Sequence, residues 1–249
     1  MSASKPSPGY HAPAATRFSA TAEPAHVPAD SAARLAGPAR WEALSLALVL
    51  TVTVSSVSRW TPIQQLWARN VGGLKALPSH WYASLVFLAV GLVLTFATAR
   101  RSGLRIGTIA DHWKAVLLVC GSSVAVTAIV YPLLPVRPWG NAPVTMWLVS
   151  PIAQSLIFIG YLYGLLQQAY PGYVHARVPI ERGLVLTVCF FALWHLPNFW
   201  SLPPNYVVFQ LFYTSVLAIV PGLSRQWTGS ILYATVTHMA INFIARYAS

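Results

Sequence analysis

Seven long apolar stretches constrain the fold of this chain more than any other feature of its sequence. Each is long enough to cross about 30 Å of hydrocarbon at about 1.5 Å per helical residue. They run over residues 42–59, 82–99, 115–134, 144–168, 183–200, 205–221 and 229–247. Inside a bilayer the backbone N–H and C=O groups must bond within their own segment, which requires helices. The sequence therefore predicts an all-α integral membrane protein, a polytopic bundle of about seven transmembrane helices.

The composition excludes a soluble globular domain. Only 8% of the 249 residues are charged and 56% are hydrophobic, whereas about 25% of residues are charged in a soluble domain. The formal net charge is +11, but the basic residues are spread through the loops and do not form a stripe with aromatic residues. We therefore exclude nucleic acid as a partner and expect the lipid bilayer to be the main surrounding of the chain.

The first forty residues differ from the rest, because they are rich in Ala, Pro and Ser and poor in aliphatic residues. Such a segment cannot bury enough apolar surface to become ordered. It also lacks the apolar core of a signal peptide. The sequence predicts a disordered, retained tail over 1–40 and a transmembrane helical domain over 41–249. Residues 60–80 are amphipathic and rich in turn residues, which favours a loop with a short interfacial helix.

The distribution of basic residues predicts the orientation. With the N-terminus inside, eleven of the sixteen Lys and Arg residues fall in cytoplasmic segments and five on the other side. Positively charged loops face the cytoplasm in most membrane proteins. We therefore expect a cytoplasmic N-terminus in a plasma membrane of bacterial (inner-membrane) type.

Several polar side chains lie within the apolar stretches: His195, His238, Asn242, Gln154 and Ser155. His238 and Asn242 are four residues apart and share one helix face. A polar group that faced lipid would lose its hydrogen bonds at a cost of several kcal/mol, so we expect these groups to point inward and meet. None of the five acidic residues lies inside a predicted span beyond its first residue. The alternative interpretation is that the polar groups are hydrogen-bonded contacts between helices with no further role.

Two sequence motifs resemble those of a known family. FALWH contains Phe191 and His195, and HMAIN contains His238 and Asn242, preceded by TGS at 228–230. In order and on separate apolar helices, they resemble the FxxxH and HxxxN motifs of the CAAX-processing and bacteriocin-immunity (CPBP, or Abi) intramembrane proteases. The type II CAAX prenyl endopeptidases are members of that family. The resemblance covers roughly residues 144–247.

The first family motif, a glutamate pair followed by an arginine, is altered in this chain. The stretch SPIAQSLIFIGYLYGLL places Gln154 and Ser155 at the two glutamate positions and Ile159 at the arginine position. The resemblance implies peptide-bond hydrolysis within the membrane. His195 would hold the attacking water, and His238 with Asn242 would stabilise the oxyanion. Gln154 would take the position of the base, and Ser155, Phe158, Ile159 and Phe191 would line the site.

Three hypotheses follow from this pattern. Because an amide cannot accept the proton of a water, we expect an impaired or non-proteolytic homologue that binds a membrane-embedded or lipidated peptide or protein. The alternative is an active intramembrane endopeptidase that uses His195, or a water ordered by Gln154. A third hypothesis is a small-solute transporter. Two histidines and an asparagine without a carboxylate make a poor zinc site, so we expect neither a metal nor another cofactor.

Overall fold

A computed structural model describes residues 37–57, 79–104, 113–133, 148–175, 178–200 and 202–247. The chain divides into two units, Met1–Arg34 and Leu35–Ser249, and all described residues belong to the second. The predicted tail over 1–40 lies outside the described residues except at its last four positions, which begin the first helix. The predicted interfacial segment over 60–80 also lies outside them, apart from 79 and 80.

The described residues form a helical membrane protein, as the sequence predicted. The helices are α2 (Gly37–Val57), α4 (Ser79–Ala97), α5 (Ala99–Ser102), α6 (Trp113–Val130), α7 (Ser150–Gln154), α8 (Tyr163–Ala169), α9 (Arg182–Leu193), α10 (Pro204–Thr228) and α11 (Ile231–Tyr247). Short 3₁₀ turns cover Tyr131–Leu133 (η2) and Leu196–Trp200 (η5), and Ser155–Leu162 (η4) is a π-helix between α7 and α8. Among the described residues, the stretches Trp113–Val130, Arg182–Trp200 and Pro204–Thr228 are each long and apolar enough to cross a membrane.

The structure departs from the sequence prediction at the sixth predicted span and in the loop before α9. The sixth helix continues through Pro221 to Thr228, beyond the end expected at 221, because its polar last turns find buried partners in other segments. The loop before α9 contains a small antiparallel hairpin, β1 (Tyr173–His175) paired with β2 (Val178–Glu181). This hairpin is a local addition to an otherwise helical fold.

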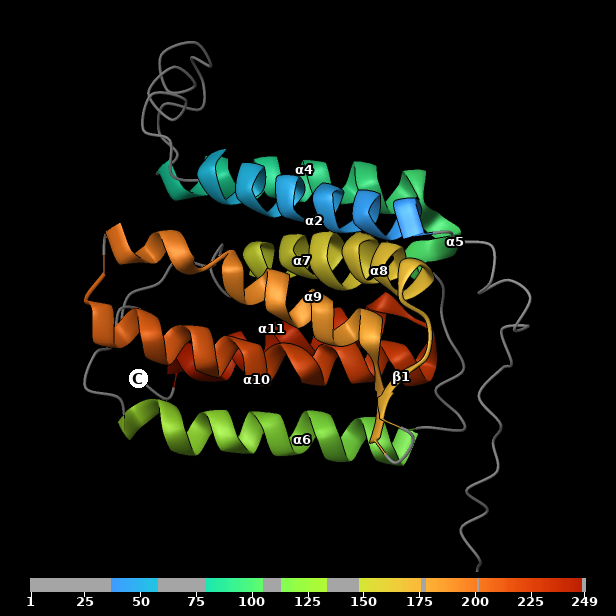
Figure 1. Cartoon of the computed structure of the whole chain (residues 1–249). Helices are drawn as coiled ribbons and strands as arrows, with labels where there is room; N and C mark the ends of the chain where they lie inside the picture. The colour runs from blue at the N-terminus through green and yellow to red at the C-terminus, as the bar shows by residue number, and fades with distance from the viewer. Residues whose placement is uncertain are drawn as a thin grey trace, which may run out of the picture. The chain divides into compact units, whose positions relative to one another are not determined.

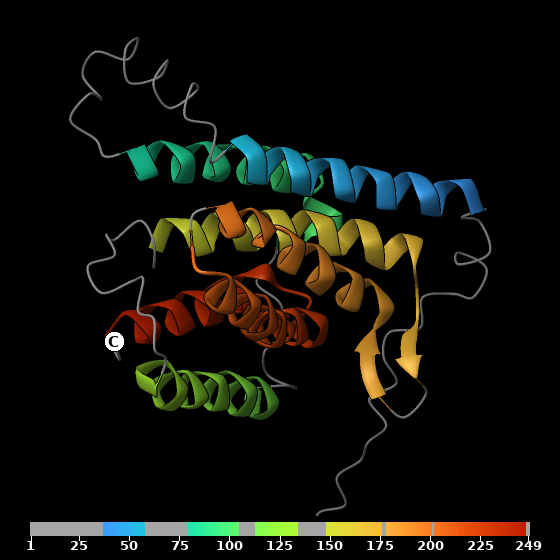
Figure 2. The same ribbon diagram turned by 60° about the vertical axis from the view of Figure 1, so that its left-hand side comes forward.

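The helices of the second unit pack in layers, and the α7–η4–α8 segment lies in the middle. Figure 1 shows α2 and α4 on one side of that segment, with α9, α10 and α11 on its other side. Helix α6 packs against α10 and α11 on the face farthest from α2 and α4, and Figure 2 shows the same order after a turn of the view. The central segment is therefore enclosed by protein, which allows polar side chains to be placed along it.

Close contacts fix the central segment against its neighbours. Ala153, Phe158 and Leu162 are fully buried. At Gly164 in α8, a side chain would collide with the backbone carbonyl of Arg101 in α5. By contrast, the space around Gly121 in α6 is open. The α5 turn and α8 therefore approach each other at a distance that only glycine permits.

We predict that Gly164→Ala destabilises the fold by about 1–3 kcal/mol, because the backbone carbonyl it meets cannot rotate away. The matched control, Gly121→Ala, should leave stability unchanged or raise it by up to about 1 kcal/mol through helix propensity. Thermal unfolding in detergent micelles measures both. Equal effects of the two substitutions would contradict the packing described for α5 and α8.

Candidate functional site

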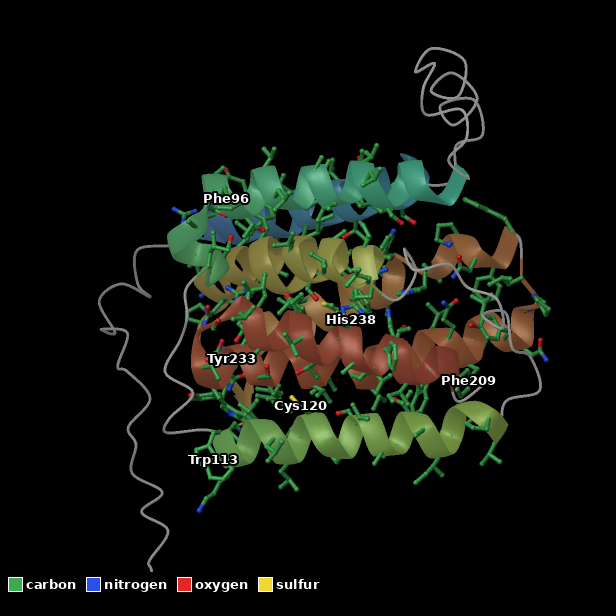
Figure 3. The ribbon with its side chains drawn as sticks, turned by 180° about the vertical axis from the view of Figure 1, so that it is seen from behind. Phe96, Trp113, Cys120, Phe209, Tyr233 and His238 are labelled. Atoms are coloured by element: carbon green, nitrogen blue, oxygen red, sulfur yellow. The ribbon has the colours of Figure 1, made fainter. Side chains whose placement is uncertain are left out.

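A hydrogen bond between Ser155 and His238 joins the central segment to α11. Ser155 is the first residue of η4 and is fully buried. Its Oγ lies 3.1 Å from Nδ1 of His238. Figure 3, seen from behind, shows His238 between α11 and the layer that contains α7 and η4. The sequence predicted that these two polar side chains point inward. In the structure they do so and bond to each other, although they are 83 positions apart in the chain.

The two candidate histidines pack against the same aromatic ring. The Phe191 ring centroid lies 5.1 Å from that of His195 and 5.8 Å from that of His238. The imidazoles are also near enough to each other to interact electrostatically. His195 follows α9 at its C-terminal turn, and His238 belongs to α11, so two helices bring their imidazoles to one phenylalanine.

The tautomer of His195 follows from its partner. Nδ1 of His195 lies 2.9 Å from the carbonyl oxygen of Phe191. A carbonyl oxygen only accepts hydrogen bonds, so Nδ1 carries the proton. Nε2 of His195 then carries the lone pair and can accept a hydrogen bond or a proton.

An aromatic wall borders the histidines. The ring of Phe158 lies 5.2 Å from Phe191 in an edge-on arrangement and 5.3 Å from Trp194 in a stacked one. Phe158 is fully buried. Ile159, also predicted to line the site, is buried in the same π-helix, but no ring or hydrogen-bond contact connects it to the histidines.

The structure does not join Gln154 and Asn242 to the other candidates by hydrogen bonds. Nε2 of Gln154 donates to Oγ of Ser150, one turn earlier in the same helix, at 2.8 Å. Asn242 is half-buried, one turn after His238 on α11. Within the part of the chain that the structure describes, neither amide bonds to a histidine. Ser155, Phe158, Phe191, His195 and His238 therefore form the contiguous part of the candidate site, which we call the histidine site.

Sequence reasoning missed a buried cation that contacts the central segment. Arg225 falls between the predicted spans 205–221 and 229–247, which place it in a cytoplasmic loop, but it lies in α10 and is only 4% exposed. Its guanidinium donates to the carbonyl of Gly160 at 2.7 Å and to that of Arg101 at 2.6 Å, and it lies 4.6 Å from the centre of the Tyr163 ring. Ser224 and Thr228, four residues apart beside Arg225, were the available signal that a polar helix face continues past Pro221.

The Tyr163 hydroxyl connects Arg225 to an acidic residue. It donates to Oε2 of Glu181 at 2.6 Å, and Gln167 donates to the same oxygen at 2.7 Å. Glu181 ends β2, just before α9. Its partial burial raises the pKa of the carboxyl above its ordinary value, although the hydrogen bonds from Tyr163 and Gln167 and the nearby Arg225 act in the opposite direction.

We predict a pH dependence from Glu181. Because its folded-state pKa is raised, its protonation favours the fold, and this contribution is present at low pH and lost as pH rises through the folded pKa. The free energy of unfolding of the natural chain should therefore rise relative to that of Glu181→Gln as pH falls from neutral to about 5. Thermal unfolding of both proteins in detergent at the two pH values measures this difference. A difference independent of pH would contradict the raised pKa.

The part of the chain that carries the histidine site resembles a known protein family. A family model described as type II CAAX prenyl endopeptidase Rce1-like matches residues 139–244. That segment includes α7, η4, α8, α9 and α10 and most of α11, and so all residues of the histidine site. No curated protein and no solved structure matched significantly. Residues 139–244 are therefore similar to the Rce1-like type II CAAX prenyl endopeptidases, in agreement with the resemblance that the FALWH and HMAIN motifs predicted.

Proposed function

We propose that this chain is a membrane protein that binds a membrane-embedded or lipidated peptide on a CAAX-protease-like scaffold, without glutamate-dependent proteolysis. The observation that carries this proposal is the uncharged character of the histidine site. Ser155, which aligns with a family glutamate, bonds to His238 at 3.1 Å. Ile159, which aligns with the family arginine, is an uncharged, buried side chain.

The loss of the acids removes the ordinary general base. Positioned general-base catalysis contributes about 10²–10⁴ in rate. The amide of Gln154 cannot accept a proton at neutral pH, and its Nε2 is bonded to Ser150. Binding does not need a base, so a binding role is the function that these residues support best.

The lining of the histidine site fits a ligand with both hydrocarbon and amide or carbonyl groups. Phe158, Phe191 and Trp194 offer an aromatic wall. His195 and His238 offer neutral hydrogen-bonding groups beside that wall. Ligand sites typically combine such an apolar lining with a few polar groups that fix orientation. A lipid-modified peptide has both kinds of surface.

We also propose an orientation of the chain in the membrane. With the buried Arg225 set aside, ten basic residues on the predicted cytoplasmic side against five on the other support a cytoplasmic N-terminus, which we place in a plasma membrane of bacterial type.

Binding is tested with a farnesylated peptide that carries a photoreactive diazirine, added to the purified full chain in lipid nanodiscs. We expect saturable crosslinking to η4, α9 or α11, with the peptide left intact. His195→Ala should weaken binding about tenfold, the effect of losing one hydrogen bond to the ligand. His175→Ala, on the exposed β1 strand, is the matched control and should have no effect. Peptide cleavage that His195→Ala abolishes would refute the non-proteolytic role, and crosslinks confined to other segments would refute the binding site.

A second candidate is a weak endopeptidase that uses His195 as its base. The observation in its favour is the bond from Nδ1 of His195 to Phe191, which leaves the lone pair on Nε2. On this hypothesis Gln154→Glu should raise the rate of peptide cleavage by about 10²-fold or more, because it restores a carboxylate. Gln168→Glu, an exposed position on α8, is the control and should have no effect. If neither the natural chain nor Gln154→Glu cleaves prenylated or single-span peptides, the endopeptidase hypothesis fails.

A further inference from the structure

We propose that Ser155 and His238 form a nucleophile–base pair that acts on fatty-acyl esters or thioesters presented by the membrane. This inference goes beyond the proposed binding function, and it rests on that function only in requiring that the histidine site admits a membrane ligand. Oγ of Ser155 and Nδ1 of His238 are 3.1 Å apart. A serine and a histidine within hydrogen-bond reach are the structural signature of an activated nucleophile.

The partner of the Ser155 hydroxyl is unusual for a hydroxyl within this bundle. The hydroxyls of Ser123, Thr127, Thr187 and Thr228 each donate to a backbone carbonyl one turn earlier in their own helix. That bond satisfies a hydroxyl in lipid without any second helix. Ser155 instead bonds to an imidazole, which can take up its proton.

The local backbone positions Ser155 for this bond. It is the first residue of the π-helix η4, and π-helical turns are rare and frequently occur at functional sites. Two bonds from other helices hold this segment: Oγ1 of Thr95 donates to the Leu156 carbonyl at 3.1 Å, and Arg225 donates to the Gly160 carbonyl at 2.7 Å. The hydroxyl is thus held at the histidine by a supported segment, as a reactive group requires.

The proton transfer fixes the roles of the two nitrogens of His238. When Oγ–H of Ser155 donates to Nδ1, the imidazole carries its own proton on Nε2. In the first step Nδ1 accepts the Ser155 proton while Oγ bonds to the acyl carbonyl carbon, whose π electrons move to its oxygen. When this tetrahedral intermediate collapses, the bond from the acyl carbon to the leaving oxygen or sulfur breaks. The leaving group takes the proton from His238, and the acyl group remains on Ser155.

Water completes the reaction. His238 accepts a proton from a water molecule while the water oxygen attacks the acyl–serine carbonyl, and Oγ of Ser155 leaves with that proton. The products are a free fatty acid, an alcohol or thiol, and the original serine, so no oxidant or reductant is needed. Asn242, one turn from His238 on α11, is the nearest side-chain amide along that helix for the oxyanion.

The expected substrate is an ester or thioester because the described site residues include no carboxylate to stabilise the imidazolium. In serine hydrolases a buried acid performs that role. Alcohol and thiol leaving groups depart more readily than an amine, so their release requires less stabilisation of the His238 imidazolium. The aromatic wall of Phe158, Phe191 and Trp194 is suited to the apolar acyl chain.

The test uses a long-chain alkyl fluorophosphonate on the purified full chain in detergent micelles, with the adduct located by mass spectrometry. We expect one adduct on Ser155, none in Ser155→Ala, and labelling slowed at least about 10²-fold in His238→Gln, because the base is lost. Ser123→Ala is the control, since the Ser123 hydroxyl bonds within its own helix, and it should be labelled like the natural chain. A folded natural chain that stays unlabelled, or equal labelling of Ser155→Ala, would overturn the proposal.

A second variant tests the proposal if Ser155→Ala does not fold. Ser155→Cys keeps a nucleophile of similar size. The new thiol should react with a long-chain chloroacetamide faster than the natural cysteines Cys120 and Cys189 do. In the double variant Ser155→Cys with His238→Gln, the thiol at position 155 should react no faster than the natural cysteines. If the thiol at position 155 reacts at the same rate with and without His238→Gln, the pairing of Ser155 with His238 is overturned. Release of fatty acid from phospholipid vesicles or from an S-acylated peptide then identifies the source of the acyl group. Peptide crosslinking without any Ser155 adduct would remove this inference and leave the binding function in place.

Discussion

The arrangement of the central segment depends on one buried guanidinium. Arg225 donates to the carbonyls of Gly160 and Arg101 and lies over the Tyr163 ring, so it joins α10 to η4, α5 and α8. A cation inside a membrane bundle is costly unless such partners surround it. The carbonyl of Gly160 also accepts a hydrogen bond from the backbone N–H of Tyr163, so Arg225 adds a second bond at the π-helix and ties it to α10.

The same reasoning explains the chemistry of the histidine site. Carboxylates at this depth would need a cation or several donors to remain charged. The chain instead has a serine and an isoleucine where the family motif has ionisable residues, and its buried cation is bonded to carbonyls and not to an acid in the site. The site is thus maintained by neutral hydrogen bonds, which limits it to ligands and reactions that need no fixed charge.

The sequence predicted most of the fold because long apolar stretches depend on no distant partner. It also identified Ser155, Phe191, His195 and His238 through their polarity or motif, and the structure brings these residues together. It did not anticipate that Gln154 would bond to Ser150, since an amide can be satisfied within its own helix or across the bundle. Arg225 and Glu181 were missed because their partners are distant: Gly160 and Arg101 for the first, Tyr163 and Gln167 for the second. The short β1–β2 hairpin gave no periodic signal.

Helix α11 also contacts α6, through the residue that directly precedes His238. Sγ of Cys120 in α6 lies 2.7 Å from Oγ1 of Thr237, and Thr237 directly precedes His238 in the chain. Successive helix residues point about 100° apart, so one turn of α11 connects both to α6 and to Ser155. Much of α6 faces outward, where lipid would surround it. The orientation of the imidazole is therefore braced from two directions within a single turn, by the outer helix α6 at Thr237 and by Ser155 at His238.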